Sequence, residues 1–357
     1  MSEFVASNLS NAAAVREFTN GAGQPTPDHP SAMTEGEVRF ITKMILDETM
    51  ELLATMYPAS VAKQTMKTFI DDSKDLPMES YKETDTFQKI ADQADALVDI
   101  YYYSLNAACK KGMNLSAIFG IVHQANMNKR DPATGKFIKR ESDGKIIKPA
   151  GWTPPDVEGE IQRQLQDGAW SSGSKPTSNA AAVREFTNGA GQPTPDHPSA
   201  MTEGEVRFIT KMILDETMEL LATMYPASVA KQTMKTFIDD SKDLPMESYK
   251  ETDTFQKIAD QADALVDIYY YSLNAACKKG MNLSAIFGIV HQANMNKRDP
   301  ATGKFIKRES DGKIIKPAGW TPPDVEGEIQ RQLQDGAWKQ QLPADEVDEN
   351  EGIARAN

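Results

Sequence analysis

Apolar residues recur at helical spacing along most of the chain and predict a set of amphipathic helices. The longest runs from about Thr84 to Lys111, and its apolar positions, such as Ile90, Leu97 and Tyr101, cover well over half of its circumference. A helix this apolar is typical of the centre of a bundle. The same spacing predicts helices at about 34–56, 60–71 and 115–127, and shorter helices at about 11–19 and 154–166.

Residues that favour helix ends stand at the borders of these stretches. Thr34 followed by Glu37 is a capping-box pattern, and Asp85 with Gln88 is a start signal for the central helix. Gly112 is well placed to end the central helix, and Asn114 to cap the next one. Four main helices with short connections predict an all-α, four-helix-bundle-like domain.

The segment after the fourth helix is different in character. Asp143-Gly144 stands between two short runs, at 137–140 and 145–148, and this pattern indicates a hairpin or an ordered loop. The segment is basic in an otherwise acidic chain, with Lys129, Arg130, Lys136, Lys139, Arg140, Lys145 and Lys148. We expect a small basic arm there, which either contacts phosphate or is simply a solvated hairpin.

The whole pattern occurs twice. Residues 10–170 recur without a single change as residues 178–338, and each copy has the usual size of one domain. Residues 171–177, S-S-G-S-K-P-T, have the small, polar composition of a flexible linker, and residues 339–357 predict an acidic, disordered tail. A very recent duplication and a built tandem fusion both explain such identity.

The net charge, the lengths of apolar runs and the cysteine content restrict the classes of function that the chain can have. The net charge of −13 argues against binding of polymeric nucleic acid but leaves single nucleotides open. The chain has no apolar run of 18 residues, and residues 1–9 do not resemble a secretory signal. Cys109 and Cys277 are the same position in the two repeats, so neither repeat has a second cysteine to pair with. These features favour a reducing, cytoplasmic setting with no membrane partner.

Three aspartates interrupt the apolar surface of the central helix. Asp92, Asp95 and Asp99 stand at i, i+3 and i+7 and therefore lie on one stripe. Like charges on a mostly buried helix repel one another and resist losing their water. A divalent cation is the obvious group to neutralise them.

The first long helix supplies matching carboxylates. Glu48 follows the apolar line of Ile41 and Ile45, and Glu51 lies three residues further on. A glutamate pair alone is usually a solvated helix face. Beside the aspartate stripe it predicts an oxygen-rich site that suits Mg²⁺ or Mn²⁺ and is a poor zinc site. We therefore expect four carboxylates to converge within each repeat, with a fifth one turn away. In the first repeat these are Glu48, Glu51, Asp92 and Asp95, with Asp99 as the fifth. In the second repeat they are Glu216, Glu219, Asp260 and Asp263, with Asp267 as the fifth.

Competing metal chemistry is less well supported. Di-iron bundle proteins need Glu-x-x-His on two helices, and here Glu48-x-x-Glu51 and Asp92-x-x-Asp95 lack the histidine. Glycine-rich phosphate loops, zinc signatures and nucleophile elbows are absent from the sequence.

These motifs resemble a known superfamily. D-E-T-M-E at 47–51 and D-Q-A-D at 92–95 are similar to the signature of the all-α NTP pyrophosphohydrolases, which include MazG-type enzymes, dimeric dUTPases and phosphoribosyl-ATP pyrophosphohydrolases. The segments A-D-A-L-V-D-I-Y-Y, H-Q-A-N-M-N-K-R-D-P-A-T-G-K and D-G-K-I-I-K-P look like the phosphoribosyl-ATP pyrophosphohydrolase-like branch. Asp47 and Asp92 depart from the pattern, because glutamate is commoner at both positions.

The resemblance implies Mg²⁺-dependent hydrolysis of a nucleoside triphosphate between its α and β phosphates, giving a monophosphate and pyrophosphate. A dNTP is the first choice of substrate, with phosphoribosyl-ATP as an alternative. A catalytically silent nucleotide-binding or scaffold bundle is the hypothesis from another class.

The resemblance also implies roles for individual residues of the site. Glu48, Glu51 or Asp99, with Glu216, Glu219 or Asp267 in the second copy, is expected to orient or deprotonate the attacking water. Phosphate neutralisation is assigned to Lys129, Arg130, Lys148, Lys297, Arg298 and Lys316. Asn126 and Asn294 are expected to contact base or sugar. The superfamily forms dimers or tetramers, so the tandem is expected to be a tethered dimer, with further pairing of chains open.

Overall fold

A computed structural model describes residues 10–73, 86–141, 146–170, 178–241, 254–309 and 314–338. These ranges hold twelve α-helices and no β-strand, so the predicted all-α class is confirmed. The first repeat contributes α1 (Asn11–Gly21), α2 (Glu35–Ala54), α3 (Ala59–Asp71), α4 (Thr86–Lys110), α5 (Leu115–Met127) and α6 (Val157–Asp167). The second contributes α7 (Asn179–Gly189), α8 (Glu203–Ala222), α9 (Ala227–Asp239), α10 (Thr254–Lys278), α11 (Leu283–Met295) and α12 (Val325–Asp335).

The helix ends follow the capping residues. Thr34 accepts a hydrogen bond from the backbone N–H of Glu37 in a complete capping box at the start of α2. Asn114 caps α5 in the same way through Ala117. Gly112, at φ +77°, turns the chain just after α4. The predicted start of the central helix at 84–85, the Asp143-Gly144 turn, the linker and the acidic tail lie outside the described residues, as do residues 1–9.

The basic arm is ordered in its described part. It holds two isolated antiparallel bridges, Arg130 with Phe137 and Lys139 with Ile146. A tight turn at its base is fixed by Asp131, whose carboxylate accepts hydrogen bonds from the backbone N–H and the hydroxyl of Thr134. The two runs thus pair in antiparallel fashion without forming strands, and the turn at 142–145 that would distinguish a hairpin from a loop lies outside the described residues.

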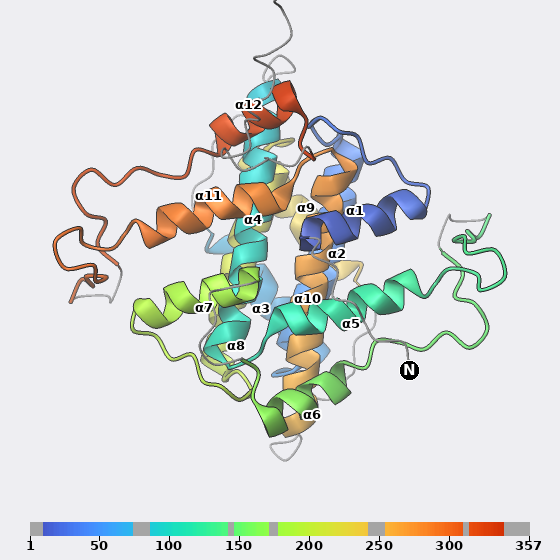
Figure 1. The fold of residues 1–357 in the computed structure, drawn as a ribbon, viewed down its shortest axis with the longest axis horizontal. Helices are drawn as coiled ribbons and strands as arrows, with labels where there is room; N and C mark the ends of the chain where they lie inside the picture. Colours follow the sequence, from blue (N-terminus) through green and yellow to red (C-terminus); the bar gives the residue numbers. More distant parts are fainter. Residues whose placement is uncertain are drawn as a thin grey trace, which may run out of the picture.

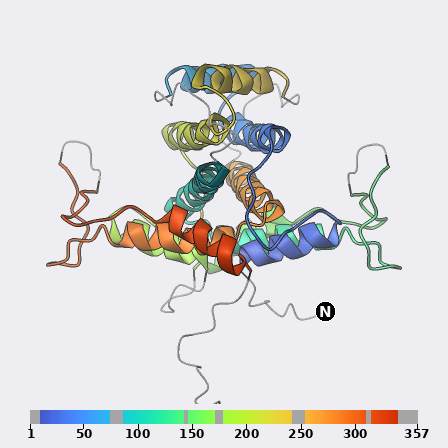
Figure 2. The same ribbon diagram turned by 90° about the horizontal axis from the view of Figure 1, so that it is seen from above.

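The helices are stacked in layers about an approximate two-fold axis (Figures 1 and 2). Figure 2 shows α3 and α9 in the outermost layer, then α2 with α8, then α4 with α10, and finally the shorter helices α1, α5 and α6 with their copies. The central helices α4 and α10 are covered on both sides. Their apolar circumference is thereby buried, as the sequence pattern predicts.

The two repeats are interleaved rather than placed side by side. Helix α4 of the first repeat packs on α8 and α10 of the second, and α10 packs on α2 and α4 of the first. Helices α2 and α8 also touch, so these four helices form one ring. Between α2 and α4, which belong to the same repeat, the described coordinates contain no pair of Cα atoms within 8 Å. The core is therefore one bundle shared by both repeats, and the sequence-based domain borders remain predictions.

Buried polar and aromatic contacts tie the repeats together. The fully buried Gln93 amide accepts from the backbone N–H of Met33 at 2.8 Å and donates to the Thr223 hydroxyl of the other repeat at 3.2 Å. Tyr101 and Tyr269 stack with ring centroids 4.6 Å apart and planes 6° from parallel. Such satisfied buried groups favour one arrangement of the bundle over its alternatives. No helix within the described ranges is both long and apolar enough to span a membrane.

Candidate active site between the repeats

The acidic stripes meet across the repeats. The aspartates of α4, Asp92, Asp95 and Asp99, face α8 with Glu216 and Glu219, and we call this group site 1. Site 2 is the symmetric group, with Asp260, Asp263 and Asp267 on α10 facing Glu48 and Glu51 on α2. The expectation that Glu48, Glu51, Asp92 and Asp95 converge within one repeat is therefore wrong. Helices α2 and α4 stand diagonally across the four-helix ring, and each takes its neighbour from the other copy.

Burial and mutual repulsion set the protonation of these carboxyls. Burial, together with the charges of Asp95 and Glu219, raises the pKa of Asp99 to about 7, although Lys297 opposes the shift. Burial and the charges of Asp95, Glu326 and Glu219 raise the pKa of Asp92 to about 6. Asp260 in site 2 has a pKa of about 6 for the matching reasons, with Glu51 among its neighbours. Each site thus concentrates negative charge from both repeats.

The donor set fits a hard divalent cation. All the acids of each site are carboxylates on two contacting helices, and Glu48 and Glu216 are only 6 % and 8 % exposed. In the described part of the chain, no three His, Cys, Asp or Glu side chains form a group already close enough to hold an ion. The acids therefore line two facing helices without forming a closed cage.

Asp47 differs from this group in having a lysine partner on its own helix, although its charge also acts on Tyr271 beside Glu48 and Glu51. Its carboxylate pairs along the same helix with the Lys43 ammonium, at 2.9 Å from Nζ to Oδ2, and Asp215 pairs with Lys211 at 2.7 Å. The first acid of the D-E-T-M-E motif therefore has its own counter-charge, while Glu48 and Glu51 lie on the helix that faces α10.

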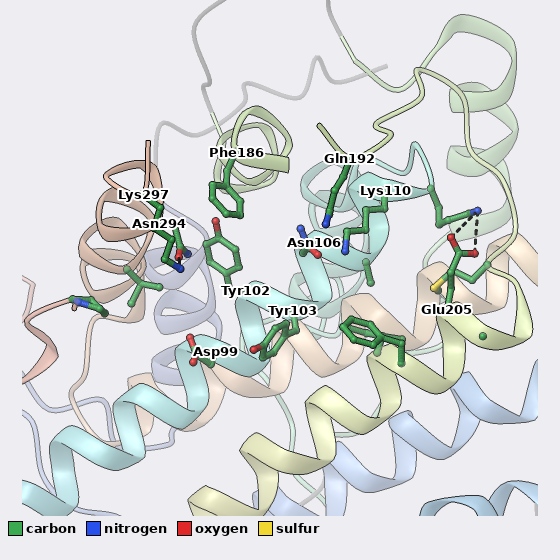
Figure 3. Close-up of a pocket in the computed structure, with 18 of the residues that line it drawn as sticks. Asp99, Tyr102, Tyr103, Asn106, Lys110, Phe186, Gln192, Glu205, Asn294 and Lys297 are labelled. Atoms are coloured by element: carbon green, nitrogen blue, oxygen red, sulfur yellow. Dashed lines mark hydrogen bonds and ion pairs between the residues drawn. The ribbon is translucent and has the colours of Figure 1, made fainter. Parts of the chain in front are cut away.

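A cavity of about 530 Å³ opens beside site 1, within the usual size range of small-ligand pockets. Asp99 and Tyr103 of α4 line it together with Asn294 and Lys297 from the end of α11 (Figure 3). Burial, then the charges of Glu216 and Asp99, raise the pKa of Tyr103, which keeps its hydroxyl protonated as a donor toward the acids. Asn294 and Lys297 of the second repeat thus share one cavity with Asp99 of the first.

Two of the predicted nucleotide-binding residues, Asn294 and Lys297, line this cavity, and Lys316 lies next to it. Lys297 donates to the Asn294 carbonyl oxygen at 2.6 Å and lies 5.6 Å from the centroid of the Trp320 ring. Lys316 lies over the same ring at 4.1 Å, and Trp320 itself lines the cavity. The equivalent residues of site 2 make the same contacts. Lys129 donates a hydrogen bond to the side-chain oxygen of Asn126, and Lys129 and Lys148 lie over the Trp152 ring.

The predicted arginines do not join them. Arg298 lies over the Phe305 ring and 3.6 Å from the Glu185 carboxylate, and it lines a separate recess with His291. Arg130 has the same environment beside Phe137 and Glu17. Arg298 is therefore not among the residues that line the cavity with Asp99.

The far end of the cavity contains residues that the sequence did not single out. Asn106, Lys110 and Gln192 gather there, and Phe208 forms part of the wall. Asn106 and Lys110 stand seven and eleven residues after Asp99, which is the same stripe of α4, so their spacing was an available signal. Gln192 and Phe208 come from the other repeat, and only the interleaved fold reveals their contribution.

Of three comparisons with known proteins, the match to a protein family shows which family the chain belongs to. A search of the curated proteins found no match. Among solved structures, a "putative NTP pyrophosphohydrolase" from Exiguobacterium sp. 255-15 is similar, with 28% identity and a TM-score of 0.39 over 45% of this chain and 98% of that one. The family described as phosphoribosyl-ATP pyrophosphohydrolase matches residues 15–126 and again residues 183–294. These two segments cover more than half of the chain, and the protein therefore belongs to this family of pyrophosphohydrolases.

Proposed function

We propose that the protein is a Mg²⁺-dependent nucleotide pyrophosphohydrolase with two active sites, each cleaving the α–β phosphoanhydride of a nucleoside triphosphate, preferably a dNTP. The products are the nucleoside monophosphate and pyrophosphate. The observation that carries the proposal is the meeting of the α4 aspartates with Glu216 and Glu219 at the edge of a cavity that also contains Lys297. Carboxylates and a lysine around one cavity suit a substrate with several phosphates.

Glu216, Glu219, Asp92 and Asp95 are the residues that would hold the ion in site 1. When bound, Mg²⁺ or Mn²⁺ would screen the phosphate oxygens and lower the pKa of the attacking water. The same role in site 2 falls to Glu48, Glu51, Asp260 and Asp263.

Asp99 is the proposed general base of site 1, and Asp267 that of site 2. Its pKa of about 7 matches the pH at which a base must both accept and release a proton. Asp99 lines the cavity, so its carboxylate can take a proton from water beside the α phosphate. Lys297 keeps part of the Asp99 population ionised, because its positive charge opposes the upward shift of the pKa.

The neighbouring basic groups balance substrate charge. Lys297 lines the cavity, and Lys316 lies over the Trp320 ring that also lines it, so both ammonium groups are near enough to pair with phosphate oxygens. The Asn294 amide lies between Lys297 and the Tyr102 hydroxyl and is placed to bond the sugar or a phosphate. Burial lowers the pKa of Lys297, so an arriving phosphate would stabilise its charged form.

Pyrophosphate release from all common NTPs and dNTPs, with Mg²⁺ or with EDTA, tests the proposal. We expect release from at least one nucleotide with Mg²⁺, and none with EDTA. The variant Glu48→Gln with Glu216→Gln should lose activity, because both sites lose a metal-binding acid.

The matched control changes the neighbouring acids, Asp47→Asn with Asp215→Asn. Those acids are ion-paired with Lys43 and Lys211, so most activity should remain. Failure to release pyrophosphate from any of these nucleotides and from phosphoribosyl-ATP would reject the enzyme and favour a silent nucleotide-binding bundle. Equal activity of the Glu48/Glu216 variant and its control would reject the assigned site.

A further inference from the structure

The cavity of site 1 has two chemically different ends. Asp99 and Lys297 mark the end beside the acids, while Asn106, Lys110 and Gln192 point toward one another at the other end (Figure 3). Along α4, Asn106 stands seven residues and Lys110 eleven residues beyond Asp99, or about 10 and 16 Å at the helical rise. A nucleotide whose phosphates reach Asp99 and Lys297 therefore extends its base toward Asn106 and Lys110.

Lys110 is a half-buried cation close to the Glu205 carboxylate, which favours its charged form, and to the Lys307 ammonium, which opposes it. The described residues provide it with no hydrogen bond and no ion pair, and its closest marked contact is the Phe208 ring, 5.9 Å from Nζ to the centroid. The next lysine, Lys111, is paired with Glu205 at 3.2 Å. Burial lowers the pKa of Lys110, which shows that its charge is poorly solvated. A ligand acceptor would supply what this ammonium lacks.

The other two polar groups complete a hydrogen-bonding edge. The Asn106 side-chain N–H donates to the Thr187 hydroxyl at 2.8 Å, so its carbonyl oxygen is left as the acceptor for a ligand. The side-chain amide of Gln192 also lines the cavity, and it has no hydrogen-bond partner among the described residues. It can therefore offer a ligand either its N–H donor or its carbonyl acceptor. Phe208 is 59 % exposed and offers a ring face for stacking.

We infer that this end of the cavity is a nucleobase subsite, and that Lys110 selects bases that have an exocyclic carbonyl oxygen. A lysine ammonium has three donors and no acceptor, so it pairs best with such an oxygen. Guanine, cytosine, thymine and uracil have one, whereas adenine presents an amino group and ring nitrogens. Phe208 stacks on the base, and Asn106 accepts from its N–H or amino group.

Site 2 repeats the asparagine, lysine and phenylalanine of this arrangement. Asn274 donates to Thr19 at 2.8 Å, and Lys278 lies 5.8 Å from the centroid of Phe40, which lines a cavity with Asn274 and Lys278. Both sites are therefore expected to disfavour adenine nucleotides. The inference rests on the proposed function, since it takes the ligand to be a nucleotide.

Equilibrium binding of α,β-imido analogues of the dNTPs, which resist cleavage at the α–β position, tests the inference without turnover. With Mg²⁺ present, we expect the dATP analogue to bind at least about tenfold more weakly than those of dGTP, dCTP, dTTP and dUTP. The double variant Lys110→Met with Lys278→Met should weaken the four carbonyl-containing analogues about tenfold and leave the dATP analogue unchanged.

The control, Lys111→Met with Lys279→Met, changes lysines that line the same two cavities but are already paired with Glu205 and Glu37, and it should keep the preference of the wild-type protein. Binding of the dATP analogue as tightly as the others overturns the inference, and this result needs no variant. A Lys110/Lys278 variant that loses all five analogues equally also overturns it, because the lysine then contacts phosphate. Neither outcome depends on hydrolysis, so failure of the proposed activity is detected separately by pyrophosphate release.

Discussion

Asp99 shows how its surroundings determine the chemistry of one side chain. On a surface this aspartate would be an ordinary ionised carboxylate. Here burial and the charges of Asp95 and Glu219 raise its pKa to about 7, and Lys297 of the other repeat moderates the shift. Only Asp95 acts from the same helix. Burial and the charges of Glu219 and Lys297 depend on how the helices pack, and Glu219 and Lys297 belong to the other repeat.

The raised pKa values predict how stability changes with pH. The pKa of Asp92 is about 6 and that of Asp99 about 7, both above the ordinary 3.8, so the folded state binds protons more tightly than the unfolded state. This contribution to stability is fully present below about pH 4 and is lost as the pH rises through about 6 and 7.

In EDTA, the melting temperature should therefore fall between about pH 5 and pH 8. Added Mg²⁺ should raise it most at the upper end, where the acids are ionised. The variant Asp99→Asn with Asp267→Asn should have a flatter profile than the wild-type protein. A melting temperature that rises with pH in EDTA across this range would contradict the assignment.

Part of the site was predictable from single residues. The stripe Asp92, Asp95 and Asp99 and the pair Glu48 and Glu51 stand out because they carry charge at positions that should be apolar. The identity of the facing helix was not predictable, since both repeats have the same sequence and local patterns cannot tell them apart. Arg130 was assigned by charge alone, and its contacts with Glu17 and Phe137 needed the fold.

At the scale of elements, helices were predicted well because their caps are local. Thr34, Asn114 and Gly112 mark helix ends through bonds or dihedral angles within a few residues. The start of α5 at Leu115 agrees with the expectation, whereas α1 continues two residues beyond the predicted Thr19. Helix packing involves residues far apart in the sequence, so no local pattern contains it.

Gly112 and Gly120 provide a matched pair for testing one helix junction. A Cβ at Gly112, which has φ +77°, would lie 2.2 Å from the His197 carbonyl oxygen of the other repeat. At Gly120, inside α5, a Cβ would have nothing within 4 Å. Ala at positions 112 and 280 should therefore lower the melting temperature, because the backbones of the two repeats must separate.

Ala at positions 120 and 288 should instead stabilise the protein by about 0.5–1 kcal/mol per site, since glycine weakens a helix interior. Chemical denaturation of the two double variants measures both effects. Equal stability of the two would show that the α4 end does not contact the loop around His197.

At the scale of the whole molecule, the tandem is one interleaved unit. The central helix of each repeat packs against the second helix of the other repeat, α4 on α8 and α10 on α2, and α4 and α10 also pack together. The covalent connection raises the effective concentration of the halves, but the shared core holds them once assembled.

Cleavage of the connection should therefore leave the assembly intact. A protease site placed within residues 171–177 would allow the folded protein to be cut into two halves. We expect the halves to co-elute in size-exclusion chromatography and to keep their pyrophosphohydrolase activity. Elution as two separate half-size species would mean that the repeats are independent domains.

Each proposed active site combines acids from both repeats. Two double variants test this arrangement most directly. Glu48→Gln with Asp263→Asn changes two residues of site 2 and leaves site 1 intact. Glu48→Gln with Asp95→Asn changes one residue in each site. For independent sites, the kcat of pyrophosphate release should be about half of wild type in the first variant and close to zero in the second. The reverse result, about half in the second variant and almost none in the first, would place each site within one repeat and contradict the interleaved bundle.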